Sequence, residues 1–532
     1  MTLPRHTVVR RLLPGCAAIA LVGLVLSGCG GSSKASGAAG AAGTDGRAAR
    51  AFPATTVAFL DANIDGQSDA WKRLLALGAR FPSFTQIVTK FDTAANRASG
   101  NGPTVQQVRS WLGSEVAVGV LDVPADGSDP SVLGFAEVRD RSSLEAQIKK
   151  DKDTVAAGTH GGFDVFTQTA GKAVIAISDD TALAGNSVAV VDAGIDRLAG
   201  TGDKLSDSSD FKDTLASLPS DNLVVGYAPG SVLQQLAAYA QRMSAARASR
   251  SATQSLTPAQ VASITAALKG VRSIGFSLGA TDAGLRMRTT SLLDGTNTSM
   301  YEPHAPALLS DVPASSWFAA DVGGISSEAT ASAEQALAAN PAAQAGVTQV
   351  ETMLGIKLAD VYALFSGENT VYAGPGAPLS AGLLLHPADA AKGATTLRAI
   401  TRFLGMQGIA FTDTADGQSA VIKGFTANWR SVGGNLAIGT DAAVGDAVKD
   451  SLVDSDKFKR VLSEDGVDAG AKTLGLAYLD VPSLVNVATA FGAFNGTGNQ
   501  EALDNLKHVG GVLFWTGRDG NIVTSDLFVE ST

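Results

Sequence analysis

Short apolar runs and amphipathic stretches alternate along the chain, separated by segments rich in glycine, proline and aspartate. The run TTVAFLD, which ends at Asp61, is typical of a buried strand, whereas WKRLLALGARF, from Trp71, has the apolar spacing of a helix. The turn sequences ATDAG and GRDGN each lie between two apolar runs, which indicates hairpins of neighbouring strands. We therefore predict an α+β fold with mostly antiparallel sheets and packed helices. In the first half, the pattern predicts strands near 55–61, 115–122, 132–138, 173–178, 222–227, 272–279 and 284–292, and helices near 69–79, 104–112, 142–150, 208–217, 231–246 and 257–268.

One order of segments occurs twice in the chain, about 250 residues apart. LSDSSDFKDTL, from Leu205, matches LVDSDKFKRVL, from Leu452, and four further pairs keep the same order. We therefore predict two copies of one unit, residues 52–295 and 312–532, joined by a linker at 296–311. The four further pairs are FPATTVAFLDA with VPASSWFAADV, VRSWLG with VETMLG, LVVGYAPGSVLQQL with LGLAYLDVPSLVNV, and LKGVRSIGFSLGATDAG with LKHVGGVLFWTGRDGN.

The repeat makes predictions about individual positions. Phe211 and Phe458 should be buried at equivalent sites on a helix that follows an Asp-Ser cap, and Tyr227 and Tyr478 should occupy equivalent strand sites. Two glycines, Gly113 and Gly355, each follow a leucine where a helix is expected to end through a left-handed glycine.

The first 28 residues have the pattern of a signal peptide, with arginines followed by the apolar run LLPGCAAIALVGLVL. The sequence LSGC, which ends at Cys29, resembles the lipobox of bacterial lipoproteins. The resemblance implies cleavage after residue 28 and lipid, such as palmitate, on Cys29. We therefore expect an exported protein anchored to the outer face of the bacterial cell membrane. The alternative is ordinary secretion with a chance cysteine.

Residues 29–51 are rich in Gly, Ala and Ser and lack apolar periodicity, which predicts a flexible tether. Cys16 lies in the removed segment, so an exported chain would be stabilised by its core without a disulfide. Loss of three arginines with the signal peptide leaves 38 basic and 51 acidic residues, a net charge of −13. No basic patch with interleaved aromatic residues is visible, which argues against a nucleic-acid partner.

Several of these features together resemble an uncharacterised family of bacterial envelope proteins, catalogued as domain of unknown function 3352. They are the lipobox, the tether, the P-A-[ST]-[ST] strand opening at Pro53 and Pro313, the W-L-G sequence ending at Gly113 and the L-x-D-S-x-x-F helix. The resemblance covers most of the mature chain and implies an envelope location with this layout. It implies no catalytic residue and no cofactor.

The stretch DANIDGQSDAW, residues 61–71, begins like a calcium-binding loop. The twelfth position, where such a loop needs a bidentate carboxylate, is Lys72. We therefore interpret the stretch as a strand that leads into a helix, with Ser68 as the helix N-cap.

GFSLG at 275–279 fits the nucleophile elbow of serine hydrolases, and HGGF at 160–163 is similar to an oxyanion-hole segment. An elbow requires a helix directly after the turn, whereas the residues after Gly279 alternate like a second strand. The alignment of the two repeat copies also matches Ser277 with Trp515. A serine and a tryptophan at equivalent positions indicate a site on the pleated surface of a sheet rather than a catalytic site. Catalysis by Ser277 remains an alternative.

The histidines remaining after signal cleavage are His160, His304, His386 and His508, and none has a metal-binding neighbour in sequence. A metal site would have to be assembled by the fold, so we predict none from the sequence.

Our first functional prediction is a non-enzymatic envelope scaffold or protein-interaction module with an envelope protein as partner. Apolar helical faces at 232–243 and 484–494 indicate core packing, or a groove for a lipid or another apolar ligand. A carrier is therefore the alternative, and a serine hydrolase using Ser277 is the second alternative. An unfilled apolar pocket would favour the carrier, and a convergent polar cluster would favour an enzyme.

Overall fold

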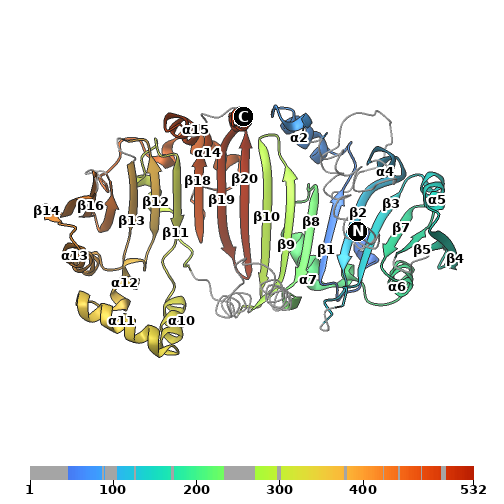
Figure 1. The fold of residues 1–532 in the computed structure, drawn as a ribbon, viewed down its shortest axis with the longest axis horizontal. Helices are drawn as coiled ribbons and strands as arrows, with labels where there is room; N and C mark the ends of the chain where they lie inside the picture. Colours follow the sequence, from blue (N-terminus) through green and yellow to red (C-terminus); the bar gives the residue numbers. More distant parts are fainter. Residues whose placement is uncertain are drawn as a thin grey trace, which may run out of the picture. The chain divides into compact units, whose positions relative to one another are not determined.

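The computed structural model divides into two compact α+β units, residues 1–296 and 297–532 (Figure 1). The predicted signal peptide, Cys29 and most of the tether lie outside the described residues, as do most of the helices predicted at 231–246 and 257–268. The structure describes residues 46–86, 89, 105–124, 128–168, 173–232, 270–295, 301–376, 380–422, 424–440, 444–468, 470–492 and 499–532.

The first unit contains one antiparallel sheet in the order β10-β9-β8-β1-β2-β3-β7-β6-β5-β4. Its strands are β1 (Ala58–Asn63), β2 (Leu112–Val120), β3 (Val132–Val138), β4 (Thr154–His160), β5 (Phe163–Gln168), β6 (Val174–Ile177), β7 (Thr181–Gly185), β8 (Val224–Pro229), β9 (Val271–Ala280) and β10 (Gly284–Leu293). Its helices are α2 (Asp69–Gly78), α4 (Val105–Trp111), α5 (Arg141–Lys150), α6 (Val188–Leu198) and α7 (Ser209–Ala216).

The second unit contains an antiparallel sheet in the order β20-β19-β18-β11-β12-β13-β17-β16-β15-β14, which matches the first sheet strand for strand. Its strands are β11 (Phe318–Val322), β12 (Asn369–Gly374), β13 (Ser380–Leu385), β14 (Thr412–Asp413), β15 (Gly417–Ile422), β16 (Phe425–Val432), β17 (Asn435–Gly439), β18 (Gly475–Asp480), β19 (Val509–Asp519) and β20 (Ile522–Ser531). Its helices are α10 (Ser327–Ala338), α11 (Pro341–Leu354), α12 (Leu358–Leu364), α13 (Ala390–Met406), α14 (Asp456–Asp465), α15 (Val481–Ala490) and α16 (Gln500–Leu506).

The same aromatic pair packs in the core of each unit. Phe211, on α7, lies 5.1 Å from Tyr227 in an edge-to-face contact, and Phe458, on α14, lies 5.2 Å from Tyr478. All four rings are buried, as predicted for the two phenylalanines, and both tyrosines lie in strands, as predicted for them. Both helices begin at a serine whose side chain accepts the phenylalanine backbone N–H, so the Asp-Ser cap fixes the position of each ring.

The seven strands predicted in the first unit are present, but β4, β5, β7 and helix α6 were not predicted. β4 is almost entirely exposed, so its sequence lacks the alternation that identifies a half-buried strand. On α15, only Val481 is buried, and the following Phe491 is 81% exposed. The apolar stretch from 484 is therefore not a core face.

The two predicted glycine caps differ. Gly355 has φ 68° and ends α11 as a left-handed residue, as expected. The prediction for Gly113 is wrong, because this residue lies in β2 and the helix ends at Trp111. A side chain at Gly113 would collide with that of Glu137, so close approach rather than backbone conformation favours glycine there.

Parts of the predicted tether and of the predicted linker take part in the folded units. At the end of the tether, Ala48 and Ala49 are buried in a 3₁₀ turn, Ala48–Arg50. In the predicted linker, His304 forms a β-bridge with Thr473, and residues Ala307–Asp311 form a further 3₁₀ turn.

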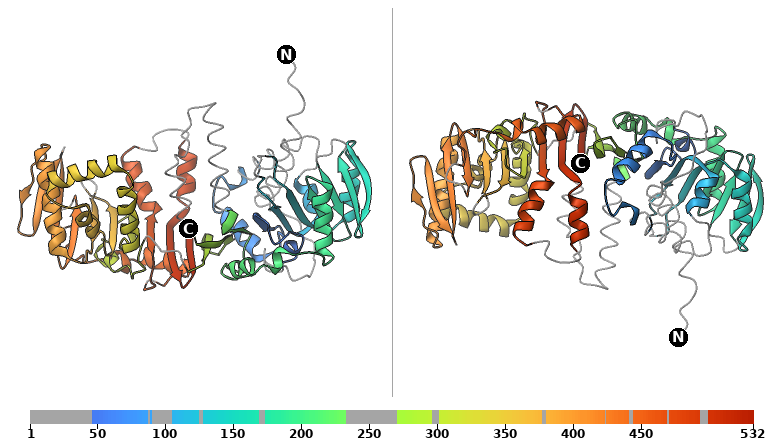
Figure 2. Two further views of the ribbon diagram at one scale, coloured as in Figure 1. Left: turned by 90° about the horizontal axis from the view of Figure 1, so that it is seen from below. Right: turned by 90° about the horizontal axis from the view of Figure 1, so that it is seen from above.

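In Figure 2, helices α10 and α11, coloured yellow, lie beside the sheet of the second unit. Across the part of the chain that the structure describes, no helix has the length and apolar character needed to cross a bilayer.

Candidate functional site

Three side chains with metal-binding atoms meet in the second unit: His304, Asp321 and Glu368. One ligand atom from each lies within 4.8 Å of the others. Asp321 is in β11 and Glu368 directly precedes β12, whereas His304 belongs to the segment before β11. The cluster therefore joins three segments that are separate in the sequence.

The sheet register explains how the two carboxylates come together. Asp321 lies directly opposite Thr370 of β12. Glu368 is two residues before Thr370 and therefore projects from the same face of the sheet. The backbone bridge between His304 and Thr473, with N···O distances of 2.9 and 2.8 Å, holds the histidine at this position.

Each carboxylate is oriented through one of its oxygens. Thr370 Oγ1 donates a hydrogen bond to Oδ2 of Asp321, and the backbone N–H of Leu308 donates one to Oε1 of Glu368 at 2.6 Å. The other Asp321 oxygen, Oδ1, contacts Nε2 of His304. The arrangement is thus built by hydrogen bonds from outside the cluster as well as within it.

The cluster is shielded from water. The side chain of Asp321 is completely buried, and that of His304 is 14% exposed. Burial raises the pKa of Glu368 well above its ordinary value, and the negative charge of Asp321 adds to this, against the opposing Leu308 hydrogen bond. Burial lowers the pKa of His304, but its hydrogen bond to Asp321 and the Asp321 charge outweigh burial, so the net shift is upward.

The carboxylates have little positive charge around them. Among the ion pairs of the described residues, Asp321 is paired with His304, and neither Asp321 nor Glu368 is paired with a lysine or arginine. One buried and one half-buried carboxylate therefore face one imidazole, which leaves an excess of negative charge that a bound cation would balance.

The sequence did not reveal this cluster, because its residues are 17 and 47 positions apart and His304 lies in a segment expected to be a linker. The one available signal was Asp321 itself, an acid inside the apolar stretch SSWFAADV. A buried acid needs a partner. Two of the other histidines in the sequence lie away from this cluster: His160 pairs with Asp196 at 2.8 Å, and His386 contacts Asn435.

The first unit has an acid pair at the corresponding strand positions. Asp61 lies opposite Ala117 in β2, just as Asp321 lies opposite Thr370 in β12, and Glu115 is two residues before Ala117. Glu115 Oε1 accepts a hydrogen bond from the backbone N–H of Ala48 at 3.3 Å. Burial raises the pKa of Glu115, with Ala48, Asp61 and the charge of Arg47 acting in the opposite direction.

The stretch that begins at Asp61 is a strand followed by a helix, as interpreted from the sequence. Oδ1 of Asn63 accepts the N–H of Asp65 at 2.8 Å, and Oδ1 of Asp65 accepts the N–H of Gln67 at 3.0 Å. Ser68 caps α2 by accepting the N–H of Trp71. The polar side chains therefore shape a turn and a helix start.

Ser277 lies inside β9, where it is 1% exposed and pairs with Val225 on one side and Arg288 on the other. A nucleophile elbow would place the serine on a turn between a strand and a helix. The HGGF segment is the hairpin between β4 and β5, with Gly161 and Gly162 at positive φ. Neither motif adopts the geometry of a hydrolase site.

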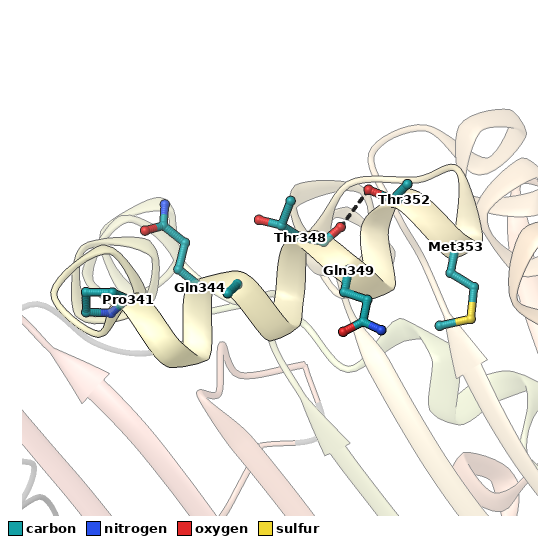
Figure 3. Close-up of a pocket in the computed structure, with 7 residues that line it drawn as sticks. Pro341, Gln344, Thr348, Gln349, Thr352 and Met353 are labelled. Atoms are coloured by element: carbon teal, nitrogen blue, oxygen red, sulfur yellow. Dashed lines mark hydrogen bonds between the residues drawn. The ribbon is translucent and has the colours of Figure 1, made fainter.

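A hollow of about 890 Å³ lies beside α11 (Figure 3). The lining residues are Pro341, Gln344, Ala345, Thr348, Gln349, Thr352 and Met353. All belong to one helix, so this hollow is an open helix face rather than an enclosed ligand cavity.

The fold defines an α+β protein with two antiparallel sheets of matching strand order, and one unit carries the His304 cluster. The chain belongs to the family described as Protein of unknown function (DUF3352), whose model matches residues 16–511. This confirms the family resemblance noted in the sequence.

The other comparisons are weak. No curated protein matches the chain. The structure of crystal form III of TP0453 is 9% identical, with 48% of this chain and 88% of that chain covered and a TM-score of 0.27. Crystal form I of TP0453 is 7% identical, with coverages of 48% and 87% and a TM-score of 0.28. Similarity at this level carries no inference about function.

Proposed function

We propose that this chain is an exported lipoprotein, held at the outer face of the bacterial cell membrane by lipid on Cys29. The signal-like segment 1–28 and the LSGC sequence support this proposal. From Cys29 to the first described residue, Gly46, a Gly- and Ser-rich coil of this length would span roughly 20–25 Å. The folded units would then stand off the membrane by about that distance.

We further propose that the folded units form a non-enzymatic scaffold or protein-interaction module. The observation that carries this proposal is the α10–α11 hairpin, in which neither helix has a buried residue. Val350 and Met353 of α11 are 48% and 46% exposed. Helices usually gain their stability by burying an apolar face, so an uncovered face of this kind is suited to a partner protein.

The carrier remains the alternative, and its support is weaker. The hollow beside α11 has a single-helix lining, whereas a lipid carrier needs walls that enclose most of its ligand. The second alternative, hydrolysis by Ser277, would require this buried strand residue to become exposed beside a base.

Native mass spectrometry of the full chain, purified gently from its own membrane, tests the scaffold proposal. We expect a stoichiometric protein partner that is lost in Met353→Glu and retained in Met406→Glu. Met406 is a matched control, because it is an exposed methionine on a different helix, α13. A stoichiometric lipid with no protein partner would favour the carrier and contradict the scaffold.

We also propose that the two units derive from one duplicated unit. The matching strand orders, the Phe211–Tyr227 and Phe458–Tyr478 pairs and the equivalent serine caps support this origin. The strand register also supports a common origin at the level of single residues. Tyr227 pairs with Gly275 and Tyr478 pairs with Leu513. Ser277 and Trp515 each lie two residues after these partners, so they occupy equivalent strand positions.

A further inference from the structure

We propose that His304, Asp321 and Glu368 form a binding site for a divalent transition-metal ion, with zinc as the ion that fits best. The site lies within the second unit and is independent of the scaffold role proposed above. Its function would be to tie the segment before β11 to the sheet.

The donor set favours this class of ion. Imidazole nitrogen suits zinc and its neighbours in the first transition row, whereas magnesium and calcium prefer sites made of oxygen alone. Zinc bonds of about 2.0–2.2 Å place tetrahedral donors about 3.3–3.6 Å apart. The three ligand atoms lie within 4.8 Å of one another. Nε2 of His304 and Oδ1 of Asp321 are in direct contact, so small side-chain movements that separate these two atoms would admit the ion.

Charge provides an independent argument. Asp321 is completely buried, and His304 is the only cationic group paired with it among the described ion pairs. A metal ion would supply the positive charge that these two carboxylates otherwise lack. The corresponding acid pair of the first unit has the charge of Arg47 nearby instead.

The surroundings have the form of an outer ligand shell. Thr370 Oγ1 orients Asp321, and the Leu308 N–H orients Glu368, each through a single carboxylate oxygen. Hydrogen bonds of this kind fix metal-binding side chains before the metal arrives. Three protein ligands leave one position of a tetrahedral zinc ion for water.

Isothermal titration of the metal-free full chain in detergent with zinc chloride tests the proposal. We expect one zinc ion per chain and an affinity at least tenfold lower in both Glu368→Gln and His304→Gln. Glu115→Gln is the matched control, because it changes the equivalent acid of the first unit, and its affinity should equal that of the parent. Circular dichroism identifies any variant that fails to fold.

Cobalt provides a readout that depends only on the folded parent. Co²⁺ bound to one histidine and two carboxylates in a four- or five-coordinate site should give visible absorption bands that zinc abolishes. Absence of saturable zinc or cobalt binding by the parent would overturn the proposal. Binding that persists unchanged in both Glu368→Gln and His304→Gln would also overturn it, because the ion would then lie elsewhere.

Discussion

Each unit places a buried aspartate and a half-buried glutamate at the same point of its sheet, but the two units surround this acid pair differently. In the first unit, Glu115 lies near the guanidinium of Arg47, which forms ion pairs with Glu137 and Asp180. Asp321 and Glu368 instead meet an imidazole, that of His304. Arginine stays protonated and cannot bind a metal, whereas histidine can lose its proton and become a ligand.

This difference shows how one framework can carry two kinds of chemistry. The strand register and a backbone N–H, from Ala48 or Leu308, position the carboxylates in both units. The neighbouring cationic group changes, and the residue opposite the aspartate is Ala117 in the first unit and Thr370 in the second. The strand register and the backbone N–H groups therefore account for the placement of the acids. The neighbouring cationic side chain, Arg47 or His304, determines whether an ion can bind.

The largest expected effect tests the shared core. Phe211→Ala and Phe458→Ala should each destabilise their own unit by about 3–5 kcal/mol, because each ring is almost completely buried against a tyrosine. Calorimetric unfolding of both variants measures the two losses. A loss below about 1 kcal/mol in either variant would contradict equivalent packing.

Zinc should distinguish the units. At a free concentration one hundred times its dissociation constant, zinc should stabilise the second unit by roughly 2.7 kcal/mol and leave the first unchanged. Thermal unfolding of the parent and of Glu368→Gln, with and without zinc, measures this. Equal zinc stabilisation of both proteins would show that Glu368 does not contribute to binding.

Substitution of Gly355 and substitution of Gly113 should each destabilise the fold, but for different reasons. Gly355→Ala should cost about 1–2 kcal/mol, because alanine is strained at φ 68° although the space beside it is empty. Gly113→Ala should instead displace Glu137, whose Oε2 accepts the Ser114 N–H at 2.6 Å. Asparagine tolerates the left-handed conformation, so Gly355→Asn should recover stability relative to Gly355→Ala, whereas Gly113→Asn should not improve on Gly113→Ala. Chemical denaturation of the four variants decides between these outcomes.

A smaller effect concerns pH in the first unit. Because burial raises the pKa of Glu115, the folded state binds this proton more tightly than the unfolded state. The contribution of protonated Glu115 to the free energy of unfolding should therefore be present at low pH. It should be lost as pH rises from about 4.5 through the pKa of Glu115 in the folded state. Glu115→Gln should flatten this part of the stability profile relative to the parent, and an unchanged profile would refute the assignment.

Much of the fold could be predicted because its strands have strong local signals. The hairpin of β9 and β10 alternates clearly around a turn, and the Asp-Ser caps mark α7 and α14. Exposed strands such as β4 lack that pattern. The His304 cluster could not be read from spacing, because strand pairing and a backbone bridge to Thr473 bring its residues together.

The most direct test of the comparison is anomalous diffraction at the zinc edge from crystals of the full chain soaked in zinc chloride. We predict one strong peak about 2.0–2.2 Å from ligand atoms of His304, Asp321 and Glu368, and none at the pair of Asp61 and Glu115. Peaks of equal height at both acid pairs, or no peak at His304, would contradict the account.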